Sequence, residues 1–108
     1  MKRRKRSLKT LIRETVRRIV KAAEPEKIIL FGSAAHGKGG PHSDLDFLVV
    51  KSCSNRRETA RIIRRNLIGV DIPIDILVAT PEDIRRYGET IGLIYRPALR
   101  EGRVMYAA

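Results

Sequence analysis

Two short apolar runs with a glycine-rich segment between them constrain the fold of this chain most. Residues 27–31 have the pattern of a buried strand, and they end directly at Gly32-Ser33. Residues 44–50 form the second run, which opens with Asp44-Leu45-Asp46. A glycine after a strand lets another group approach the backbone closely, and the N–H groups and hydroxyl that follow can donate hydrogen bonds to an anion. The first run therefore predicts a phosphate-binding turn.

Asp44 and Asp46 are two residues apart, so in a strand they lie on the same face, about 6.6 Å apart along the backbone. Two ionised carboxylates this close repel each other unless a cation, hydrogen bonds or a raised pKa compensates. Mg²⁺ prefers oxygen ligands and is commonly held by one or two carboxylates together with substrate phosphates. The turn and the acids together predict one ligand, a nucleoside triphosphate bound with Mg²⁺.

Each half of this pattern has an ordinary alternative. Gly32-Ser33 alone also fits a simple turn, and Ser43-Asp44 also fits a turn before an edge strand. The combination is more specific, and it resembles the nucleotidyltransferase superfamily that includes DNA polymerase beta. Within that superfamily the chain is most similar to the minimal nucleotidyltransferase branch, and the resemblance covers nearly its whole length.

The resemblance implies three catalytic and metal-binding acids, and Asp75 fits the third place beside Asp44 and Asp46. Asp75 also stands out on physical grounds, because an acid inside the apolar stretch 73–78 is costly unless it has a partner. An edge-strand aspartate that faces water is the alternative. Asp71 competes for the same role, but it lies in a predicted connection between Gly69 and Pro73, so Asp75 is preferred.

The resemblance also implies that Gly32, Ser33, His36 and Ser43 bind the nucleotide. Family members commonly carry arginine where this chain has His36. Arginine is a permanently charged, forked phosphate donor, whereas histidine is mostly neutral at neutral pH. His36 is therefore either a phosphate contact or a histidine on the surface of a helix. His42 lies in the loop before the acids and is either a phosphate contact or solvent-exposed.

The remaining pattern predicts one α/β (α+β) domain at residues 7–108 after a basic tail at residues 1–6. Apolar spacing and capping residues predict helices that begin near Ser7, Asn55 and Thr80, and a helical turn at 33–36. A final helical stretch is predicted from about residue 91. Pro97 would kink this stretch, and Gly102 would stop it. Strands are predicted at 27–31, 44–50 and 73–78, with a short terminal strand at 103–106. The resemblance implies the nucleotidyltransferase fold: a small mixed sheet of three to four strands with helices packed on one face and the acids on the open face.

Composition limits the partners and the location of the chain. The formal net charge is +11, and residues 2–6 are an unbroken basic run, so a nucleic-acid partner is conceivable. Aromatic residues make up only 5%, which leaves few platforms for stacking bases and disfavours that partner. No segment approaches the roughly 20 apolar residues of a membrane span, so a cytoplasmic protein is expected. Cys53 is the single cysteine, which excludes an internal disulfide.

The implied activity is a nucleotidyltransferase that uses two Mg²⁺ ions to move a nucleoside monophosphate, most typically AMP from ATP, to an acceptor hydroxyl. A chain of 108 residues has no acceptor domain, so a small surface, a second copy or a partner protein must supply the acceptor site. The resembled branch commonly serves as the antitoxin of HEPN/MNT toxin-antitoxin pairs, in which a tyrosine of the HEPN toxin can be the acceptor. Two alternatives stay open: an inactive module that neutralises a HEPN toxin by contact, which His36 favours, and a basic nucleic-acid-binding domain, which the 2–6 run favours.

Overall fold

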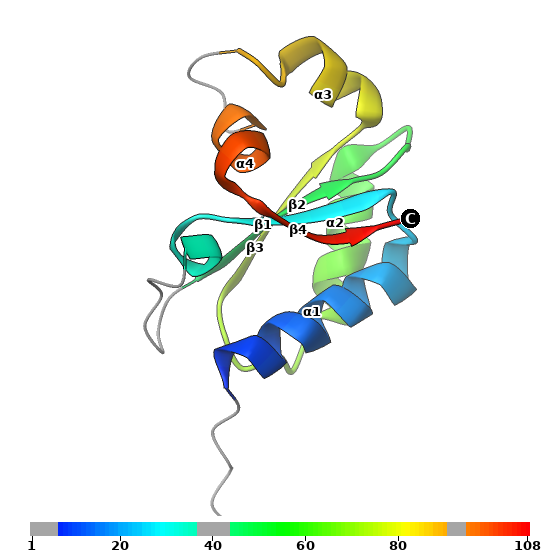
Figure 1. Cartoon of the computed structure of the whole chain (residues 1–108). Coiled ribbons are helices and arrows are strands. Elements are labelled where there is room, and N and C mark those ends of the chain that lie inside the picture. The colour runs from blue at the N-terminus through cyan, green and yellow to red at the C-terminus, as the bar shows by residue number, and fades with distance from the viewer. Residues whose placement is uncertain (1–6, 37–43, 91–94) are drawn as a thin grey trace, which may run out of the picture.

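The computed structural model describes residues 7–36, 44–90 and 95–108. Within these ranges the chain forms a four-stranded sheet in the order β3-β2-β1-β4 (Figure 1). The strands are β1 (Lys27–Phe31), β2 (Leu45–Val50), β3 (Ile74–Ala79) and β4 (Arg103–Ala107). β1 pairs antiparallel with β2 and β4, whereas β2 and β3 are parallel. This mixed sheet, flanked by helices, confirms the predicted α+β class, and the terminal strand is present.

The helices begin where the capping residues predict. They are α1 (Leu8–Ala23), the 3₁₀ helix η1 (Ser33–His36), α2 (Arg56–Asn66), α3 (Pro81–Tyr87) and α4 (Tyr95–Glu101). Ser7 and Asn55 each accept a hydrogen bond from a backbone N–H in the first turn that follows. Thr80 and Asp83 form a reciprocal capping box at the start of α3. None of the helices described is long and apolar enough to cross a bilayer.

One face of the sheet is covered by α1 and α2 (Figure 1). Ile19 of α1 and Ile63 of α2 are fully buried and pack against strand residues that include Leu30 and Phe47. Alternate residues of β1 and β2 point to this face, as the period of two in a strand requires. This layer is the main hydrophobic core of the domain.

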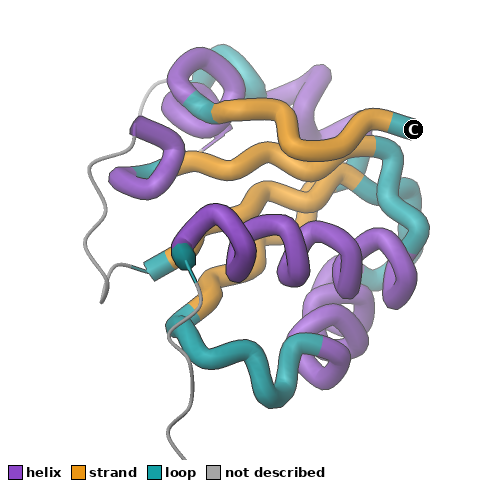
Figure 2. The backbone as a smooth tube through the Cα atoms, turned by 60° about the horizontal axis from the view of Figure 1, so that its bottom comes forward, coloured by secondary structure: helices purple, strands orange, loops and turns teal. Residues whose placement is uncertain are grey.

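The opposite face differs from the prediction that helices pack on one face only. α3 and α4 pack against part of it, so helices lie on both sides of the sheet (Figure 2). Ala98 of α4 belongs to a second buried cluster with Ile29 and Leu48, and Ile84 of α3 packs against this cluster. The reason is visible in β2, in which the last four residues are all buried, so the strand is apolar on both faces. Apolar side chains on the second face must be covered, whereas Asp75, near the start of β3, stays exposed.

One local difference from the sequence prediction concerns β2, which begins at Leu45 rather than at residue 44, so Asp44 immediately precedes the strand. In α4 as described, Tyr95–Glu101, Pro97 lies in the first turn, where a missing N–H has no intrahelical role. The predicted helical residues 91–94 lie outside the described part of the chain. α4 ends at Glu101, directly before Gly102, as predicted.

Candidate active site

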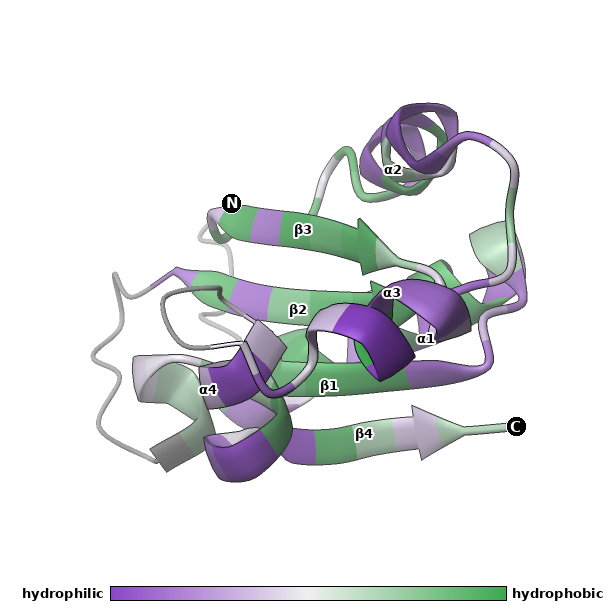
Figure 3. Cartoon of the chain, turned by 90° about the horizontal axis from the view of Figure 1, so that it is seen from above, coloured by the Kyte–Doolittle hydropathy of each residue, from purple (hydrophilic) through white to green (hydrophobic). Residues whose placement is uncertain are grey.

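The parallel register between β2 and β3 places two acids side by side. Asp46 is the register partner of Asp75, and it is also paired with Phe31 at the end of β1. Hydrophilic bands near the starts of β2 and β3 lie next to each other when the sheet is viewed from above (Figure 3). By strand alternation, Asp46 shares the face of Leu48 and Asp75 shares the face of Leu77, which is the face that α3 and α4 cover only in part.

The environment of Asp46 raises the pKa of its carboxyl above the ordinary value. Partial burial is the largest cause, followed by the charge of Asp75 and a side-chain hydrogen bond with Asp75, and then by the charge of Asp44. Asp44 itself is exposed just before the strand. Asp44 and Asp75 are therefore both within electrostatic reach of Asp46.

Gly32 connects the predicted phosphate turn to this acid cluster. Its φ of +76° is in the left-handed region, which favours glycine. A Cβ added at Gly32 would lie 2.5 Å from Oδ2 of Asp46, so a side chain at this position would force the carboxylate to shift. Ser33 follows as the first, exposed residue of η1. The turn and the acids therefore form one continuous site.

Sequence reasoning treated Gly32 only as a phosphate-binding residue and missed its contact with Asp46. A glycine after a strand is the only signal of such an approach, and it does not say which group approaches. The expected contacts of His36, His42 and Ser43 cannot be placed, because the two loop residues and the side chain of His36 lie outside what the structure describes. Asp71 lies in the connection before β3, and it does not contribute to the raised pKa of Asp46.

The acids fit a magnesium ion that shares its ligands with a nucleotide. Among the described residues, no three Asp, Glu, His or Cys side chains are already grouped as a complete metal site. Asp46 and Asp75 form an adjacent pair, however, and their mutual repulsion contributes to the raised pKa that a cation would relieve. Because Mg²⁺ keeps several waters and takes only one or two carboxylates when substrate phosphates are present, an incomplete protein site suits it.

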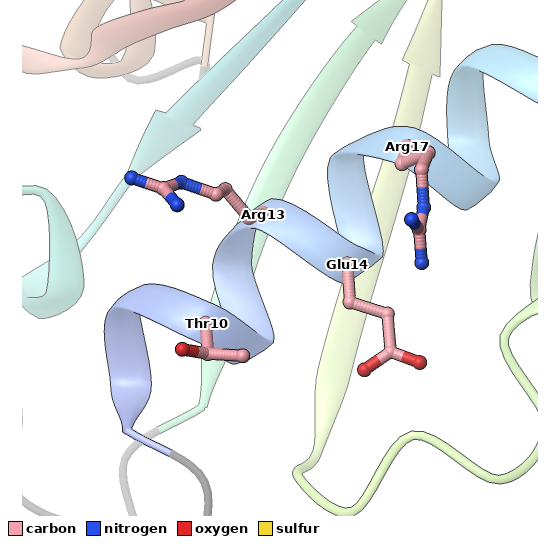
Figure 4. A pocket seen from close by; sticks show the side chains of 4 residues that line it. All are labelled: Thr10, Arg13, Glu14 and Arg17. Carbon is pink, nitrogen blue, oxygen red and sulfur yellow. The ribbon is translucent and has the colours of Figure 1, made fainter.

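A recess of about 510 Å³ on the surface of α1 is separate from the acids. Its described lining consists of Thr10, Arg13, Glu14 and Arg17, all from successive turns of that helix (Figure 4). α1 packs on the face of the sheet opposite to Asp46, so this recess and the acid cluster are separated by the sheet. It is therefore not part of the candidate active site.

The sequence pattern of the nucleotidyltransferase domain family matches residues 10–101, which extend from the first turn of α1 to the end of α4. The chain belongs to this family. The match spans Gly32, Asp44, Asp46 and Asp75, so the acid cluster lies within the nucleotidyltransferase domain. No curated protein matches the sequence significantly.

Solved structures agree with the family at the level of the fold. A Sulfolobus solfataricus protein assigned to the nucleotidyltransferases aligns with a TM-score of 0.61 at 20% identity, covering 91% of this chain and 78% of that one. A toxin-antitoxin structure with AMP-PNP aligns with a TM-score of 0.60 at 19% identity, covering 88% and 73%. Spectinomycin adenyltransferase from Enterococcus faecialis, with ATP and spectinomycin, gives 0.58 at 19% identity, covering 91% of this chain but 54% of that protein. The nucleotidyltransferase fold is thus shown for this chain.

Proposed function

We propose that this nucleotidyltransferase moves AMP from ATP to a hydroxyl of a partner protein in a Mg²⁺-dependent reaction that releases pyrophosphate. The observation that carries the proposal is the pair of acids Asp46 and Asp75, which are register partners in β2 and β3, with the Asp46 carboxylate directly against the backbone of Gly32. The fold neighbours support adenylyl transfer, since one is an adenyltransferase with ATP and another was solved with AMP-PNP.

In this reaction the chain's own residues bind and orient the nucleotide. Gly32 and Ser33 would hold the β and γ phosphates, while Asp44, Asp46 and Asp75 would hold two Mg²⁺ ions. When bound, the ions offset the negative charge on the attacking and leaving oxygens. The acceptor oxygen bonds to the α phosphorus as the bond to pyrophosphate breaks, and Asp75 accepts the hydroxyl proton.

The acceptor is proposed to be a protein because the described elements leave the acid face partly open. The four α-helices described pack against the sheet to build its two apolar clusters, while Asp44 and Asp75 stay exposed. We propose that the partner is a HEPN-type toxin and that this chain is its antitoxin. Support comes from the toxin-antitoxin neighbour, which shares the fold over 88% of this chain.

The direct test is transfer of label from ATP carrying ³²P at the α phosphate. We expect weak labelling of the chain alone and strong labelling of its natural partner, with Mg²⁺ required. Asp46→Asn and Asp75→Asn keep the side-chain volume but remove a cation ligand, so each should reduce labelling at least about 1,000-fold, or roughly 4 kcal/mol in the barrier. Asp71→Asn is the matched control and should retain activity. Equal activity in all three variants, or labelling of free RNA in preference to the partner, would contradict the proposal.

A second function is favoured by one residue, His36, which stands where the family commonly has a phosphate-binding arginine. In that case the chain neutralises its partner by contact, without chemistry. The two functions separate when partner neutralisation is measured with Asp46→Asn: neutralisation that survives the loss of labelling supports contact alone. His36→Arg provides the opposite test, since it should increase labelling if phosphate binding limits the reaction.

A further inference from the structure

The positive charge of the chain is concentrated in two helices of one layer. α1 and α2 each contain five Lys or Arg residues and a single Glu, so together they carry a net charge of +8, and residues 1–7 carry a further +5. Residues 24–55 and 67–108 contain eight Lys or Arg and ten Asp or Glu, a net charge of −2. The molecule is therefore electrically asymmetric, with its basic helices on the face of the sheet opposite to the acid cluster.

The cations of α1 form a continuous exposed stripe. Lys9, Arg13, Arg17 and Lys21 follow one another at intervals of four residues, and all are exposed. With a rise of 1.5 Å per residue the stripe is about 18 Å long. Like charges at this spacing destabilise a helix, so the arrangement opposes the folding of α1 rather than helping it.

The acids of these helices are already engaged by other arginines. Glu14 pairs with Arg18, which also donates hydrogen bonds to backbone oxygens at the end of α2. Glu58 pairs with Arg61 on α2. Among the described residues, no salt bridge involves the four cations of the stripe.

We infer that the α1 stripe is a docking surface for the phosphate backbone of double-stranded DNA. Every 18 Å of duplex carries roughly ten phosphates, so a row of four cations can neutralise several at once and release their counterions. Contacts to phosphates position a protein on the duplex and carry no sequence information, so the inferred contact fixes where the protein lies rather than which sequence it selects.

The stripe is less suited to a protein interface or to a membrane surface. The fully buried core of a protein interface is more apolar than the surface around it and is depleted in Lys, whereas the stripe consists only of charged side chains, two of them Lys. Insertion into a membrane surface requires an apolar helix face, and the apolar face of α1 is already packed against the sheet around Ile19. Interfaces with nucleic acid are wet, polar and strongly positive, which matches the stripe.

The shape of α1 favours DNA over RNA. A helix about 10–12 Å in diameter with one face free fits the mouth of the B-form major groove, which is about 12 Å wide. The major groove of A-form RNA is too narrow for such an approach. The inferred contact is on the far side of the sheet from Asp46, so bound DNA leaves the acid face open and serves as an anchor rather than as an acceptor. This inference does not depend on the transfer reaction.

The test measures binding of the nucleotide-free protein to a 20-base-pair DNA duplex by fluorescence anisotropy at several salt concentrations. The test variant replaces Arg13, Arg17 and Lys21 with Gln, a good helix former. Each lost phosphate contact should reduce the slope of log K against log salt by about 0.9, so we expect a slope about 2.7 smaller in magnitude than that of the unsubstituted protein. When the salt concentration is raised from 50 to 200 mM, the unsubstituted protein should therefore lose about 40-fold more of its affinity for DNA than the variant loses.

The matched control replaces Arg85, Arg86 and Arg100 with Gln, which changes the net charge by the same amount on α3 and α4. Its slope should stay close to that of the unsubstituted protein. Amide shifts of the unsubstituted protein on adding DNA should be concentrated in α1, a readout that does not depend on how the variants fold. No binding at 50 mM salt, an equal loss in the control, or equal or tighter binding of an RNA duplex would overturn the inference. So would a stripe variant that loses a protein partner but keeps DNA.

Discussion

The two faces of the sheet use the same strands for different purposes. On the face under α1 and α2, Phe47 and its neighbours are completely buried, and the side chains in contact are apolar. On the other face, the apolar cluster under α3 and α4 gives way to Asp46 and Asp75, which are adjacent in register and repel each other. One face thus stabilises the fold, and the other maintains an arrangement of charges that the fold alone would not favour.

This difference teaches where function is located in a small domain. Like charges are placed side by side only where a ligand can compensate them, because nothing in the stability of the isolated chain rewards their proximity. The acids occupy the start of β2 and β3, whereas the last four residues of β2 are apolar and buried. Substitutions on the two faces should therefore separate effects on stability from effects on ligand binding.

The largest expected effect on stability comes from the covered face. Phe47→Ala removes a fully buried ring and should lower the free energy of unfolding by about 3–5 kcal/mol. Leu77→Ala, on the acid face and only partly buried, should cost less, about 1–2 kcal/mol. Urea denaturation of both variants measures the difference. A larger cost for Leu77→Ala would break the division between a stabilising and a functional face.

The two glycines with positive φ provide a second, smaller contrast. Gly69 has a φ of +95° and open space around it, so Gly69→Ala should cost only the left-handed strain of about 1–2 kcal/mol. Gly32→Ala adds a collision with the carboxylate of Asp46 to a similar strain. We expect it to cost more in urea denaturation and also to abolish stabilisation by Mg·ATP, which Gly69→Ala should retain. Equal behaviour of the two variants would show that the close approach at Gly32 is unimportant.

The smallest expected effect concerns the charge of Asp46. Because burial and Asp75 raise the pKa of Asp46 in the folded state, the folded protein holds this proton more tightly than the unfolded chain. Raising the pH from below the ordinary carboxyl range through the raised value therefore lowers the free energy of unfolding. Asp46→Asn removes this cost, so without ligand the variant should melt at a higher temperature than the unsubstituted protein at about pH 7. The difference should shrink towards pH 3, and a variant that is less stable at pH 7 would contradict the repulsion.

Much of the fold could be predicted because its signals are local. Ser7, Asn55 and Thr80 cap helices at the expected positions, since a hydroxyl or amide that accepts a first-turn N–H works within one helical turn. The apolar runs predicted the strands to within one or two residues. The second helical layer was missed because apolar residues on both faces of β2 indicate burial but do not say which element covers each face.

The candidate site was only partly predictable for the same reason. The spacing of Asp44 and Asp46 indicates a shared face, but the approach of Asp75 depends on the parallel register of β2 and β3, which joins residues far apart in sequence. The resemblance to a known family supplied that link. The contact of Gly32 with Asp46 depends on the path of the backbone after β1, which a single glycine does not specify.

The central claim is that the acid face binds a nucleotide with Mg²⁺, and the most direct measurement is thermal or chemical unfolding with and without Mg·ATP. At about 100 times the dissociation constant, binding to the folded state alone should stabilise the protein by about 2.7 kcal/mol. Asp46→Asn should lose most of this gain although it is more stable without ligand, whereas Asp71→Asn should keep it. An unsubstituted protein that does not respond to saturating Mg·ATP, or an Asp46→Asn variant that responds equally, would contradict the claim.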